Sequence, residues 1–467
     1  MSDIKTTGNT ELKALYPPMA QACYAVFLLF IAYTLASIDR SILSLMVDPV
    51  RADLNLSDFE ISLLQGLAFA LLFAVVGFPV ARLADRKSRR GILAAGITFW
   101  CVMTAMCGLA SNFTQLFLAR MGVGMGEATL TPTSSSIISD YFEPRKRALA
   151  LSVYYLGYPI GGGLALIIGA AILDALSGME IIDLGFMGLY KPWQAAFFIV
   201  GIPGLAIAAM MYTIREPRRV GVIKVDGDRE DQQQVTLREL SNYIGERRKA
   251  YGAMYSAVTL LGVLAYGTVM WYPVFFMRTY GMTASEAGYA YGLMVGITGS
   301  LGLISGGFLS RWLGDKGYKD ANIRIMIFST CCKAIPLALA PLMPTAELAL
   351  LLLVPGTFFG QMSPGVNLAA FHDITPNQMR GQISAIMQFL SNTIGLGMGG
   401  ILIASITDFG FGDDSALRYS LSIAVVVLIP MILALLFYGL KHYRKCLEEA
   451  ESWNKTVGGT TGTIKGF

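Results

Sequence analysis

Four charged side chains occur in stretches of the chain that are otherwise apolar. Asp39 and Arg40 are the only charges in the first long apolar stretch, and Arg120 and Glu127 are the only charges between residues 91 and 139. A charge at bilayer depth costs roughly 2.5 to 3.5 kcal/mol even on a lenient insertion scale, so it is usually kept for a function. These two acids and two bases indicate a site that couples protons to a substrate. The alternative interpretation is a structural ion pair that joins two helices.

The composition places the chain in a membrane. Of its 467 residues, 54% are hydrophobic and 15% are charged, whereas soluble domains carry about 25% charged residues. We predict an all-α polytopic membrane protein with twelve transmembrane helices, an even number that leaves both termini on one side. The twelve apolar stretches, each long enough to span a bilayer, cover residues 19–47, 58–81, 91–110, 113–139, 146–175, 193–214, 251–277, 285–310, 323–342, 346–371, 378–406 and 417–440.

The distribution of Lys and Arg predicts the orientation of these helices. When the two tails and every second loop are assigned to one face, that face collects all but seven of the 36 basic residues. Both termini are then cytoplasmic by the positive-inside rule, and the cell inner (plasma) membrane is the expected location. The first 16 residues lack the features of a cleaved signal peptide. The seven remaining basic residues lie on the opposite face (Arg51, Lys191, Arg278 and Arg418) or within spans (Arg40, Arg120 and Lys333).

Motifs for metal binding or catalysis are missing from the sequence. The six cysteines have no CxxC or other metal-ligand spacing, and His372 and His442 are the only histidines. The chain also has no Walker loop, no GxSxG elbow and no HExxH pair. We therefore expect no metal, no cofactor and no enzymatic activity. The net charge of +4 reflects the loop asymmetry and does not indicate nucleic-acid binding.

The two halves of the chain carry matching landmarks. Capping boxes are predicted at Ser57–Glu60 and at Thr283–Glu286, where each opens the second helix of its half. The pattern RLADR at residues 82–86 recurs as WLGDK at residues 312–316, and a proline pair of equal spacing follows in each half. Each landmark recurs after nearly the same number of residues. This recurrence indicates two pseudo-symmetric six-helix bundles that are parallel repeats.

A polar linker separates the two predicted bundles. Within it Val235, Leu237, Leu240 and Ile244 lie close to helical spacing, which predicts a short amphipathic helix on the cytoplasmic surface. The expected domains are a cytoplasmic tail (1–18), an N-terminal bundle (19–213), the linker (214–250), a C-terminal bundle (251–440) and a second cytoplasmic tail (441–467).

Short motifs give the chain a family resemblance. Residues 81–90, ARLADRKSRR, resemble the signature between helices 2 and 3 of the major facilitator superfamily, with Ala81 and Ser88 where glycines are usual. The resemblance covers essentially all twelve spans. The signature of helix 4 in the same family is matched by Leu116, Arg120, Gly124 and Gly126.

Four segments of the N-terminal half carry a further resemblance: Asp39-Arg40, GVGMGEA at 122–128, residues 140–147 and LSVYY at 151–155. Within that superfamily, these segments look like the spinster family of lipid transporters. The resemblance implies a bacterial homologue and an alternating-access transporter. Residues 159–163, PIGGG, are also similar to the antiporter signature of helix 5, although Tyr158 replaces the glycine expected before the proline.

Helix geometry places the four buried charges at related depths. Arg40 lies nine residues before Pro49 and Arg120 lies eight residues after Asn112, so both are about 12 to 14 Å from one membrane face. Glu127 is two turns deeper on the same face of its helix. The family resemblance implies that helices 1 and 4 line a central aqueous chamber.

In such a chamber the charges are suited to coupled transport. Desolvation disfavours an ionised carboxylate and a nearby guanidinium favours it, so a conformational change could tip its protonation. We expect Asp39 or Glu127 to carry the proton, and Arg40 or Arg120 to bind an anionic head group, for which a guanidinium fork is well suited. The alternative for Arg120 is a packing role beside the glycines of its helix.

The C-terminal half has no matching charge cluster. An amphiphile fits this asymmetry, because the N-terminal half could hold a polar head while the other half shelters an apolar tail. For each of the aromatic and amide residues concerned, simple helix packing is the alternative. The further substrate-binding candidates are Tyr154, Tyr158, Tyr266, Gln361, Asn367, Gln388 and Asn392, with Trp271 and the lone cation Lys333 also considered for the cavity.

The repeated loop signatures predict a cytoplasmic gate. Asp85 could accept hydrogen bonds from the free amides at the start of helix 11 near Asn377, and Asp315 could do the same for helix 5 near Arg145. A solvated basic loop is the alternative, but it does not explain the repeated aspartate. The gate candidates are Asp85, Arg86, Arg90, Asp140, Arg147, Asp315 and Lys316.

These observations predict a proton-coupled secondary active transporter that moves an amphiphilic, anionic, lipid-like substrate by alternating access. Its expected partners are the lipid bilayer, that substrate and protons, and a monomer is the expected functional form. One rival is a proton symporter for a small organic anion such as a sugar acid, which a polar cavity in both halves would favour. A remote rival is a non-transporting membrane receptor, for which the sequence shows no sensory module.

Overall fold

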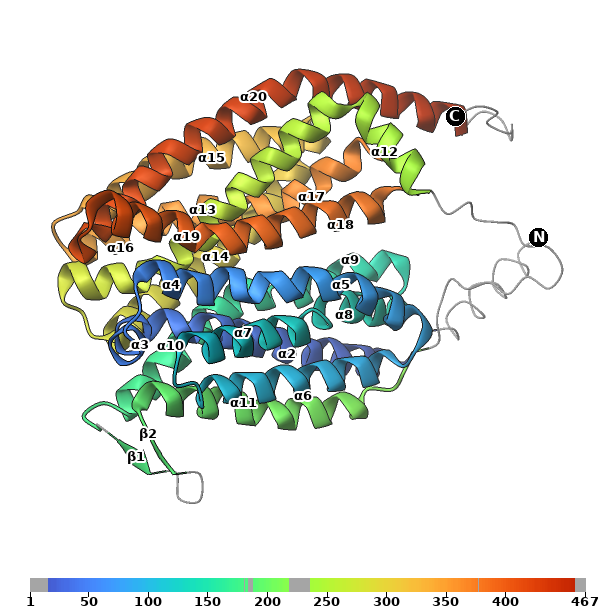
Figure 1. Cartoon of the computed structure of the whole chain (residues 1–467). Helices are drawn as coiled ribbons and strands as arrows, with labels where there is room; N and C mark the ends of the chain where they lie inside the picture. Colours follow the sequence, from blue (N-terminus) through green and yellow to red (C-terminus); the bar gives the residue numbers. More distant parts are fainter. Residues whose placement is uncertain (1–15, 180, 184–187, 218–235, 377, 458–467) are drawn as a thin grey trace. The chain divides into compact units, whose positions relative to one another are not determined.

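The computed structural model describes residues 16–457 except for 180, 184–187, 218–235 and 377. Helices dominate this part of the chain, and the predicted all-α fold with twelve membrane spans is confirmed (Figure 1). Two short strands, β1 (Ile182–Asp183) and β2 (Leu189–Tyr190), form an antiparallel pair that the sequence did not predict. They pair Ile182 with Tyr190 in the loop between two spans.

Helices of the first half of the chain run from α2 to η3. They are α2 (Met19–Leu45), α3 (Val47–Leu54), α4 (Asp58–Ser62), η1 (Leu63–Leu67), α5 (Ala68–Arg86), α6 (Arg89–Cys107), α7 (Phe113–Glu127), α8 (Leu130–Tyr141), α9 (Pro144–Tyr155), α10 (Gly157–Ala175), α11 (Pro192–Met210) and η3 (Met211–Thr213).

Helices of the second half run from α12 to α20. They are α12 (Leu237–Glu246), α13 (Arg248–Tyr280), α14 (Ala284–Asp315), α15 (Ala321–Leu339), η4 (Ala340–Leu342), α16 (Ala346–Gln361), α17 (Ser363–Asp373), α18 (Arg380–Leu390), η5 (Ser391–Leu396), α19 (Gly397–Ser405), η6 (Ile406–Phe411), η7 (Asp414–Ala416) and α20 (Leu417–Val457).

Eleven of the twelve spans are continuous enough to be recognised by length and hydropathy alone. The twelfth is the pair α7 and α8, which an interruption at Ala128 and Thr129 divides into two shorter helices. Two spans contain π-helical stretches, η1 in the span that begins at Asp58 and both η5 and η6 in the span that begins at Arg380. Such stretches are rare and often mark functional positions in a helix.

The chain divides into two compact units that do not coincide with the two sequence halves. Unit 1 contains the first half together with residues 266–297 and 396–420. Unit 2 contains residues 230–265, 298–395 and 421–467. Parts of α13, α14 and the last two spans therefore pack with the N-terminal helices.

Both predicted capping boxes are present. The Ser57 hydroxyl accepts a hydrogen bond from the Glu60 amide at 3.2 Å, and the Ser57 amide donates to Glu60 at 2.9 Å. Thr283 and Glu286 form the same reciprocal pair at 3.1 and 2.8 Å. Each box satisfies two amide groups that would otherwise lack partners at a helix start.

Small residues let α7 pack tightly between its neighbours. A Cβ atom on Gly124 would lie 2.2 Å from the carbonyl oxygen of Phe69 in α5, and one on Gly126 would lie 2.8 Å from that of Gly96 in α6. Close backbone approach of this kind is typical of helix contacts in membranes. The glycine pattern of α7 therefore positions Arg120 and Glu127 inside unit 1.

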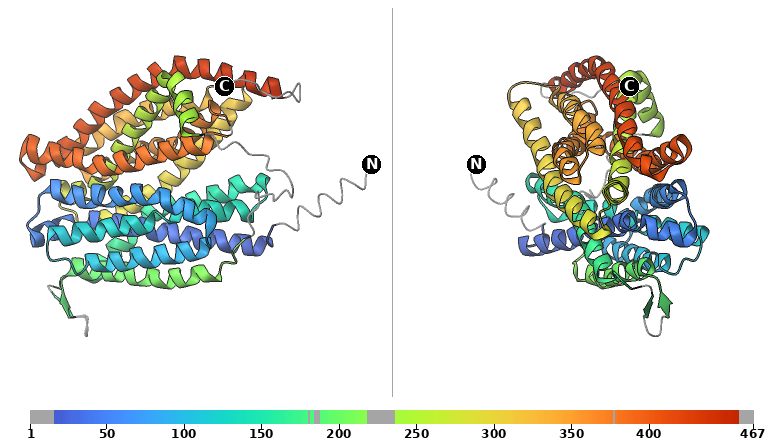
Figure 2. Two further views of the ribbon diagram at one scale, coloured as in Figure 1. Left: turned by 45° about the vertical axis from the view of Figure 1, so that its right-hand side comes forward. Right: turned by 90° about the vertical axis from the view of Figure 1, so that its left-hand side faces the viewer.

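The predicted linker helix exists as α12 and packs on unit 2 beside the end of α20 (Figures 1 and 2). Leu240 is buried, and the Tyr243 hydroxyl donates to the carbonyl oxygen of Ile374 at 2.7 Å. Arg247 pairs with Glu449 at 3.0 Å. Val235 lies outside the described residues.

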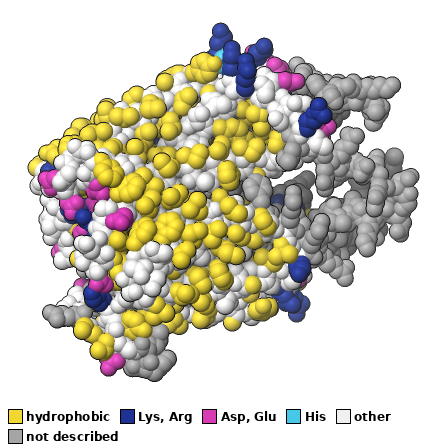
Figure 3. Space-filling model, in the orientation of Figure 1, with side chains coloured by type: hydrophobic (Ala, Val, Ile, Leu, Met, Phe, Trp, Pro, Cys, Tyr) yellow, Lys and Arg dark blue, Asp and Glu magenta, His cyan; other side chains and the backbone are white. Residues whose placement is uncertain are grey.

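Hydrophobic side chains cover the flanks of the helices, whereas charged side chains gather near the helix ends (Figure 3). Exposed apolar residues include Phe27, Val75, Leu118, Phe308 and Ile335. Continuous exposed apolar surface is what a lipid-facing helix requires.

Glu216 organises the end of unit 1 that leads into the linker. It pairs with Arg89 at 2.9 Å and accepts hydrogen bonds from the amides of Arg89 and Arg90 and from Ser88. Burial alone would raise the pKa of Glu216, but the hydrogen bonds from Arg89, Arg90 and Ser88 outweigh that effect and lower it. A carboxylate at the start of α6 also interacts favourably with the helix dipole.

We expect Glu216→Gln to lower the thermal unfolding midpoint at pH 7 by about 3 to 6 °C, because hydrogen bonds to a charged group contribute about 1.5 to 3 kcal/mol. A lowered folded-state pKa means that this contribution is present above about pH 4.3 and is lost as the pH falls through the folded-state value. The difference from wild type should therefore shrink below about pH 4. The exposed Glu347→Gln serves as control. A difference that is equal at pH 7 and pH 3.5 would contradict this role.

Candidate functional site

The four predicted charges meet inside unit 1. Asp39 and Arg120 are fully buried at 0% exposure, and Glu127 is 2% exposed. Asp39 and Arg40 come from α2, and the other two come from α7. The structure therefore brings together all four residues that the sequence singled out.

Arg120 contacts the backbone of α2 and leaves the Asp39 carboxylate without a hydrogen bond. Its Nη1 donates to the carbonyl oxygen of Asp39 at 3.1 Å, while its Nε and Nη2 have no partner among the described residues. Both carboxylate oxygens of Asp39 are also buried without a partner there. A simple structural ion pair does not describe this geometry, because an ionised carboxylate in an apolar interior requires compensation.

Arg40 is the one member of the cluster that remains accessible. Its Nε lies 3.2 Å from Glu127 Oε2 and donates to the carbonyl oxygen of Ala36 at 3.2 Å. Its side chain is 22% exposed, and its two Nη groups make no hydrogen bond to the described residues. The guanidinium carbon also lies 5.6 Å from the Phe69 ring centre, within cation–π distance. One edge of Arg40 is thus held by the protein while the other is free for a ligand.

Glu127 stands at the interruption between α7 and α8. The helix ends at this residue, and the Thr129 hydroxyl donates to the carbonyl oxygen of Gly126 at 2.8 Å. Oε1 of Glu127 is buried and has no partner among the described residues, whereas Oε2 pairs with Arg40. A helix break allows backbone adjustment at this acid without disturbing the packing of the whole span.

Tyrosines lie around Arg40. Tyr33, Tyr158 and Tyr266 are close enough to interact electrostatically with its guanidinium, and all three are half-buried. Tyr154 is fully buried and stacks on Tyr33 with ring centres 5.0 Å apart. Tyr33 was not predicted, although its position seven residues before Arg40 places it on the same face of α2.

Hydroxyl groups that have no hydrogen-bond partner among the described residues add to the polar character of this region. The hydroxyls of Thr34, Thr133, Ser134 and Tyr154 are buried without partners in the described part of the chain. Buried polar groups of this kind normally bind protein atoms, water or a ligand. The region around Arg40 therefore has donors and acceptors in excess of what the protein itself uses.

The remaining predicted substrate residues belong to unit 2. Asn367 is buried, and its side-chain oxygen has no partner in the described chain. Gln361 and Asn392 are half-buried, and Gln388 is exposed. Lys333 is 5% exposed in the same unit.

Trp271 has a packing role instead of a cavity role. It is 1% exposed, and its indole N–H donates to the carbonyl oxygen of Gly400 at 3.1 Å. Because both residues belong to unit 1, the contact joins α13 to α19 there. The alternative interpretation, helix packing, is correct for this aromatic residue.

The predicted gate residues have different surroundings. Asp140 pairs with Arg89, and Arg90 lies beside Glu216, to which its amide donates. The Nε of Arg147 is buried without a partner among the described residues. The side chains of Asp85 and Arg86, and all of Asn377, lie outside what the structure describes.

Their counterparts in unit 2 are exposed. The Asp315 side chain is 76% exposed, and its ion pair at 3.9 Å is with Arg311 of its own helix. Lys316 lies over the Trp312 ring at 3.7 Å. The centre of the corresponding end of unit 1 is formed by the buried Arg89 and the partly exposed Glu216, neither of which was among the predicted gate residues.

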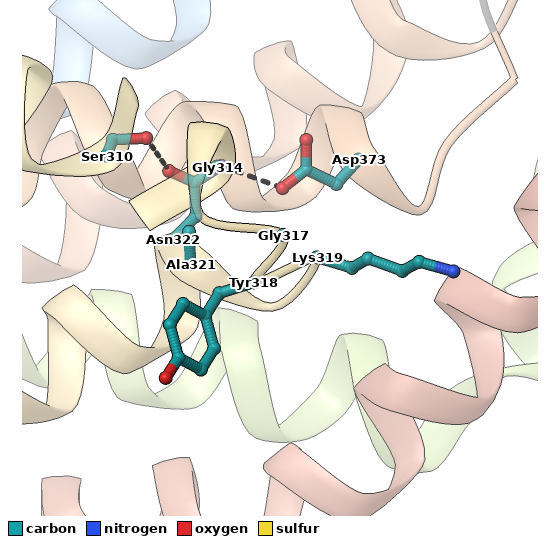
Figure 4. Close-up of a pocket in the computed structure, with 8 residues that line it drawn as sticks. All are labelled: Ser310, Gly314, Gly317, Tyr318, Lys319, Ala321, Asn322 and Asp373. Carbon is teal, nitrogen blue, oxygen red and sulfur yellow. Dashed lines mark hydrogen bonds between the residues drawn. The ribbon is translucent and has the colours of Figure 1, made fainter. Parts of the chain in front are cut away.

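A groove of about 380 Å³ lies between the end of α14 and the start of α15 in unit 2 (Figure 4). Asn322 accepts a hydrogen bond from Ser310 at 2.6 Å and donates to Asp373 at 2.7 Å, and Tyr443 donates to Asp373 at 2.9 Å. None of the predicted substrate-binding residues lines this groove. Its polar groups bind one another, so it is a structural network at the helix ends.

Comparison with known proteins identifies the family. The model of the Major Facilitator Superfamily matches residues 29–400, and the chain therefore belongs to this family of membrane transporters. Spinster proteins are among the relatives and structural neighbours, as the N-terminal motifs indicated.

Individual relatives carry different descriptions. An MFS-type efflux pump of Mycolicibacterium smegmatis is 26% identical over 92% of this chain and 95% of its own. A probable L-galactonate transporter of Escherichia coli is 27% identical over 79% of both chains. A sphingosine-1-phosphate transporter of Danio rerio is 26% identical over 60% of this chain and 54% of its own.

The fold has a close solved counterpart. A bacterial homologue of the human lysosomal transporter spinster, in an inward-facing and occupied conformation, has a TM-score of 0.75. It is 24% identical, and the match covers 91% of this chain and 98% of the other. This likeness supports the fold.

We expect Asp39→Asn to leave the thermal unfolding midpoint in detergent unchanged or up to about 3 °C higher, because the carboxylate accepts no hydrogen bond from the described residues that the amide would lose. Glu127→Gln should lower the midpoint, since it removes the ion pair with Arg40. Fluorescence-detected unfolding of the two purified variants measures both effects. A loss of more than about 4 °C in Asp39→Asn would mean that this carboxylate has a structural partner.

Proposed function

We propose that the protein is a proton-coupled secondary active transporter that moves an anionic, amphiphilic, lipid-like substrate by alternating access. The observation that carries this proposal is the geometry of Arg40, which pairs with Glu127 through one edge and presents a free edge. We place the protein in the cell inner membrane with both termini in the cytoplasm, following the distribution of Lys and Arg.

Proton coupling follows from competition for Arg40. When an anionic group binds the free edge of Arg40, it reduces the attraction between Arg40 and Glu127. The ionised form of Glu127 is then less favoured in its buried surroundings, and a proton binds. Asp39 precedes Arg40 in the sequence, and its buried carboxylate accepts no hydrogen bond from the described residues. Asp39 is therefore the second group that can carry a proton.

An anionic head group suits the chemistry of this cluster. The Nη donors of a guanidinium match the oxygens of a phosphate or carboxylate in a bidentate arrangement. Hydroxyls of Tyr33, Tyr158 and Tyr266 lie near Arg40 and supply further donors. With both acids ionised, the charges of Asp39, Arg40, Arg120 and Glu127 sum to zero, so a proton that accompanies a bound anion restores neutrality in the cluster.

The apolar remainder of the substrate is supported by the asymmetry between the units. In the membrane-spanning part of unit 2 that the structure describes, Lys333 is the buried charged residue, and the other candidates are amides. The resemblance to spinster proteins points in the same direction, and one relative is described as a sphingosine-1-phosphate transporter.

A proton symporter for a small sugar acid is the second candidate. Relatives described as transporters of L-galactonate, hexuronate and galactarate or D-glucarate favour it. The buried hydroxyl groups around Tyr154 would suit a polyhydroxylated anion. Thermal-shift titration with lysophospholipids, sphingoid phosphates and sugar acids separates the candidates, because a bound ligand stabilises the folded protein by RT ln(1 + [L]/Kd).

We predict that Asp39→Asn and Glu127→Gln each abolish accumulation driven by a pH gradient, because each replaces a buried acid that can carry a proton. Uptake of the stabilising ligand into proteoliposomes under an imposed gradient is the measurement. Asp174→Asn, which changes an exposed acid, should transport like wild type. Accumulation at the wild-type level in both buried-acid variants would exclude the coupling role.

Arg40→Ala should weaken binding of an anionic lysolipid by more than about 1.5 kcal/mol, the lower end for a hydrogen bond to a charged group. An uncharged amphiphile of equal chain length should be affected little. Arg40→Lys is the matched variant, since it keeps the charge but loses the planar fork, and should give an intermediate loss. Fluorescence titration in detergent measures all three. Equal losses for charged and neutral lipids would mean that Arg40 shapes the cavity, and the sugar-acid symporter would then be favoured.

A further inference from the structure

A second charge cluster lies at the opposite end of unit 1 from Glu216. The positive-inside distribution leaves only four basic residues on this face of the predicted topology, so their presence needs a reason. Two of them, Arg51 and Arg278, belong to this cluster, and Lys191 pairs separately with Asp53. Three of the four basic residues on the disfavoured side are thus engaged in ion pairs.

Arg278 binds two carboxylates of the first sequence half. Its Nη2 lies 2.7 Å from Asp48 Oδ1, and its Nη1 lies 2.6 Å from Asp58 Oδ2. Its Nη2 also donates to Asp58 Oδ1 at 2.9 Å, so the contact with Asp58 is bidentate. This arrangement is the strongest geometry for an arginine–carboxylate pair.

Arg51 extends the network in the other direction. Its Nη1 lies 2.9 Å from Asp58 Oδ1 and 2.7 Å from Asp414 Oδ2. Nearby, the carboxylate of Asp408 accepts a hydrogen bond from the Phe59 amide at 2.8 Å. The bonds from Arg51 to Asp414 and from Phe59 to Asp408 join residues 48–60 to the second half of the chain. The bond from Arg51 to Asp58 holds the carboxylate that Arg278 also binds.

The centre of the network is buried. Asp58 is 0% exposed and the Arg278 side chain is 10% exposed. Asp58, Asp408 and Asp414 lie close enough to share a cation, but Arg51 and Arg278 already supply the compensating positive charge. Removing one partner of a buried ion pair is far more costly than removing an exposed one.

The same parts of the chain also contact each other through their backbones. A Cβ atom on Gly66 would lie 2.6 Å from the carbonyl oxygen of Leu396. A Cβ atom on Gly163 would lie 2.6 Å from that of Gly292, and the reverse contact is 2.7 Å. Helices of the first half thus touch α14 and the junction of η5 and α19 with no side chain in between.

We propose that Asp48, Arg51, Asp58, Arg278 and Asp414 form an electrostatic latch that holds the chain closed at the membrane face opposite the linker. Opening of that face separates residues 266–297 and 396–420 from the first-half helices and breaks the bonds of Asp58. The proposal rests on alternating access from the proposed function, but it does not depend on the identity of the substrate or on proton coupling.

Spin labels at Ala52→Cys and Ser415→Cys test the latch, with the exposed native residues Cys23 and Cys331 replaced by serine. Both label sites are exposed. Ala52 follows Arg51 and Ser415 follows Asp414, so the two labels flank the ion pair between those residues. Continuous-wave electron paramagnetic resonance reports the short distance and double electron–electron resonance reports longer ones, both on the purified chain without substrate. When the latch is intact, the short distance should be the main population and a longer distance a minor one. In Asp58→Asn the population of a longer distance should rise about tenfold or more, which corresponds to about 1.4 kcal/mol.

Asp53→Asn is the matched control, because Asp53 pairs with Lys191 and Trp193 on the same face but only within the first half. Its distance distribution should equal that of wild type. Arg278→Lys, which keeps the charge and loses the bidentate contact, should lie between wild type and Asp58→Asn. Distributions that are the same in Asp58→Asn and Asp53→Asn would overturn the latch. If Asp58→Asn shifts the distances as expected but the protein does not accumulate substrate when a pH gradient is imposed, the latch is supported and only the proposed proton coupling is contradicted.

Discussion

A charge in the interior of a membrane protein must be neutralised by a partner, by a proton or by a ligand, and this constraint organises the first unit of the protein. Three buried charges and the partly exposed Arg40 lie together, but the pairing is incomplete. Arg40 and Glu127 neutralise each other across two helices, while Asp39 and Arg120 meet only through a backbone carbonyl. The charges of the cluster sum to zero, but several of its hydrogen-bond donors and acceptors have no partner among the described residues. Such a site can exchange a proton or an anion at lower cost than a fully paired one.

The surrounding helices determine which charge is free. Glycines in α7 allow it to approach α5 and α6 at backbone distance, and this contact places Glu127 beside Arg40. The break after Glu127 then separates α7 from α8. Rigid packing on one side of the acid and an interrupted helix on the other allow local movement without loss of the bundle. The position of Arg40 between Glu127 and the tyrosines follows from these two features.

Residues close in sequence were the easiest to predict. The four charges, the twelve spans, the capping boxes at Ser57 and Thr283 and the linker helix all give local signals in composition or spacing. The family resemblance could also be recognised from short motifs and is confirmed by the match to residues 29–400.

Features that depend on distant contacts could not be predicted in this way. Glu216 follows a span by three residues and looks like an ordinary linker acid, yet it binds the start of α6, more than 120 residues earlier in the chain. Tyr33 gains its role from a stack on Tyr154, and Trp271 loses a cavity role because its N–H meets Gly400. The partners of Arg278 lie 220 and 230 residues away in the sequence, so no local sequence pattern predicts them.

The central claim is that anion binding at Arg40 and protonation of Glu127 are linked, and linkage must be reciprocal. Titration calorimetry with an anionic ligand, repeated in buffers of different ionisation enthalpy, counts the protons that binding takes up. The account predicts net proton uptake by wild type, at a pH where Glu127 is ionised before binding, and uptake near zero for Glu127→Gln. Tight binding of the anion with no proton uptake by wild type at any pH between about 5 and 9 would contradict it.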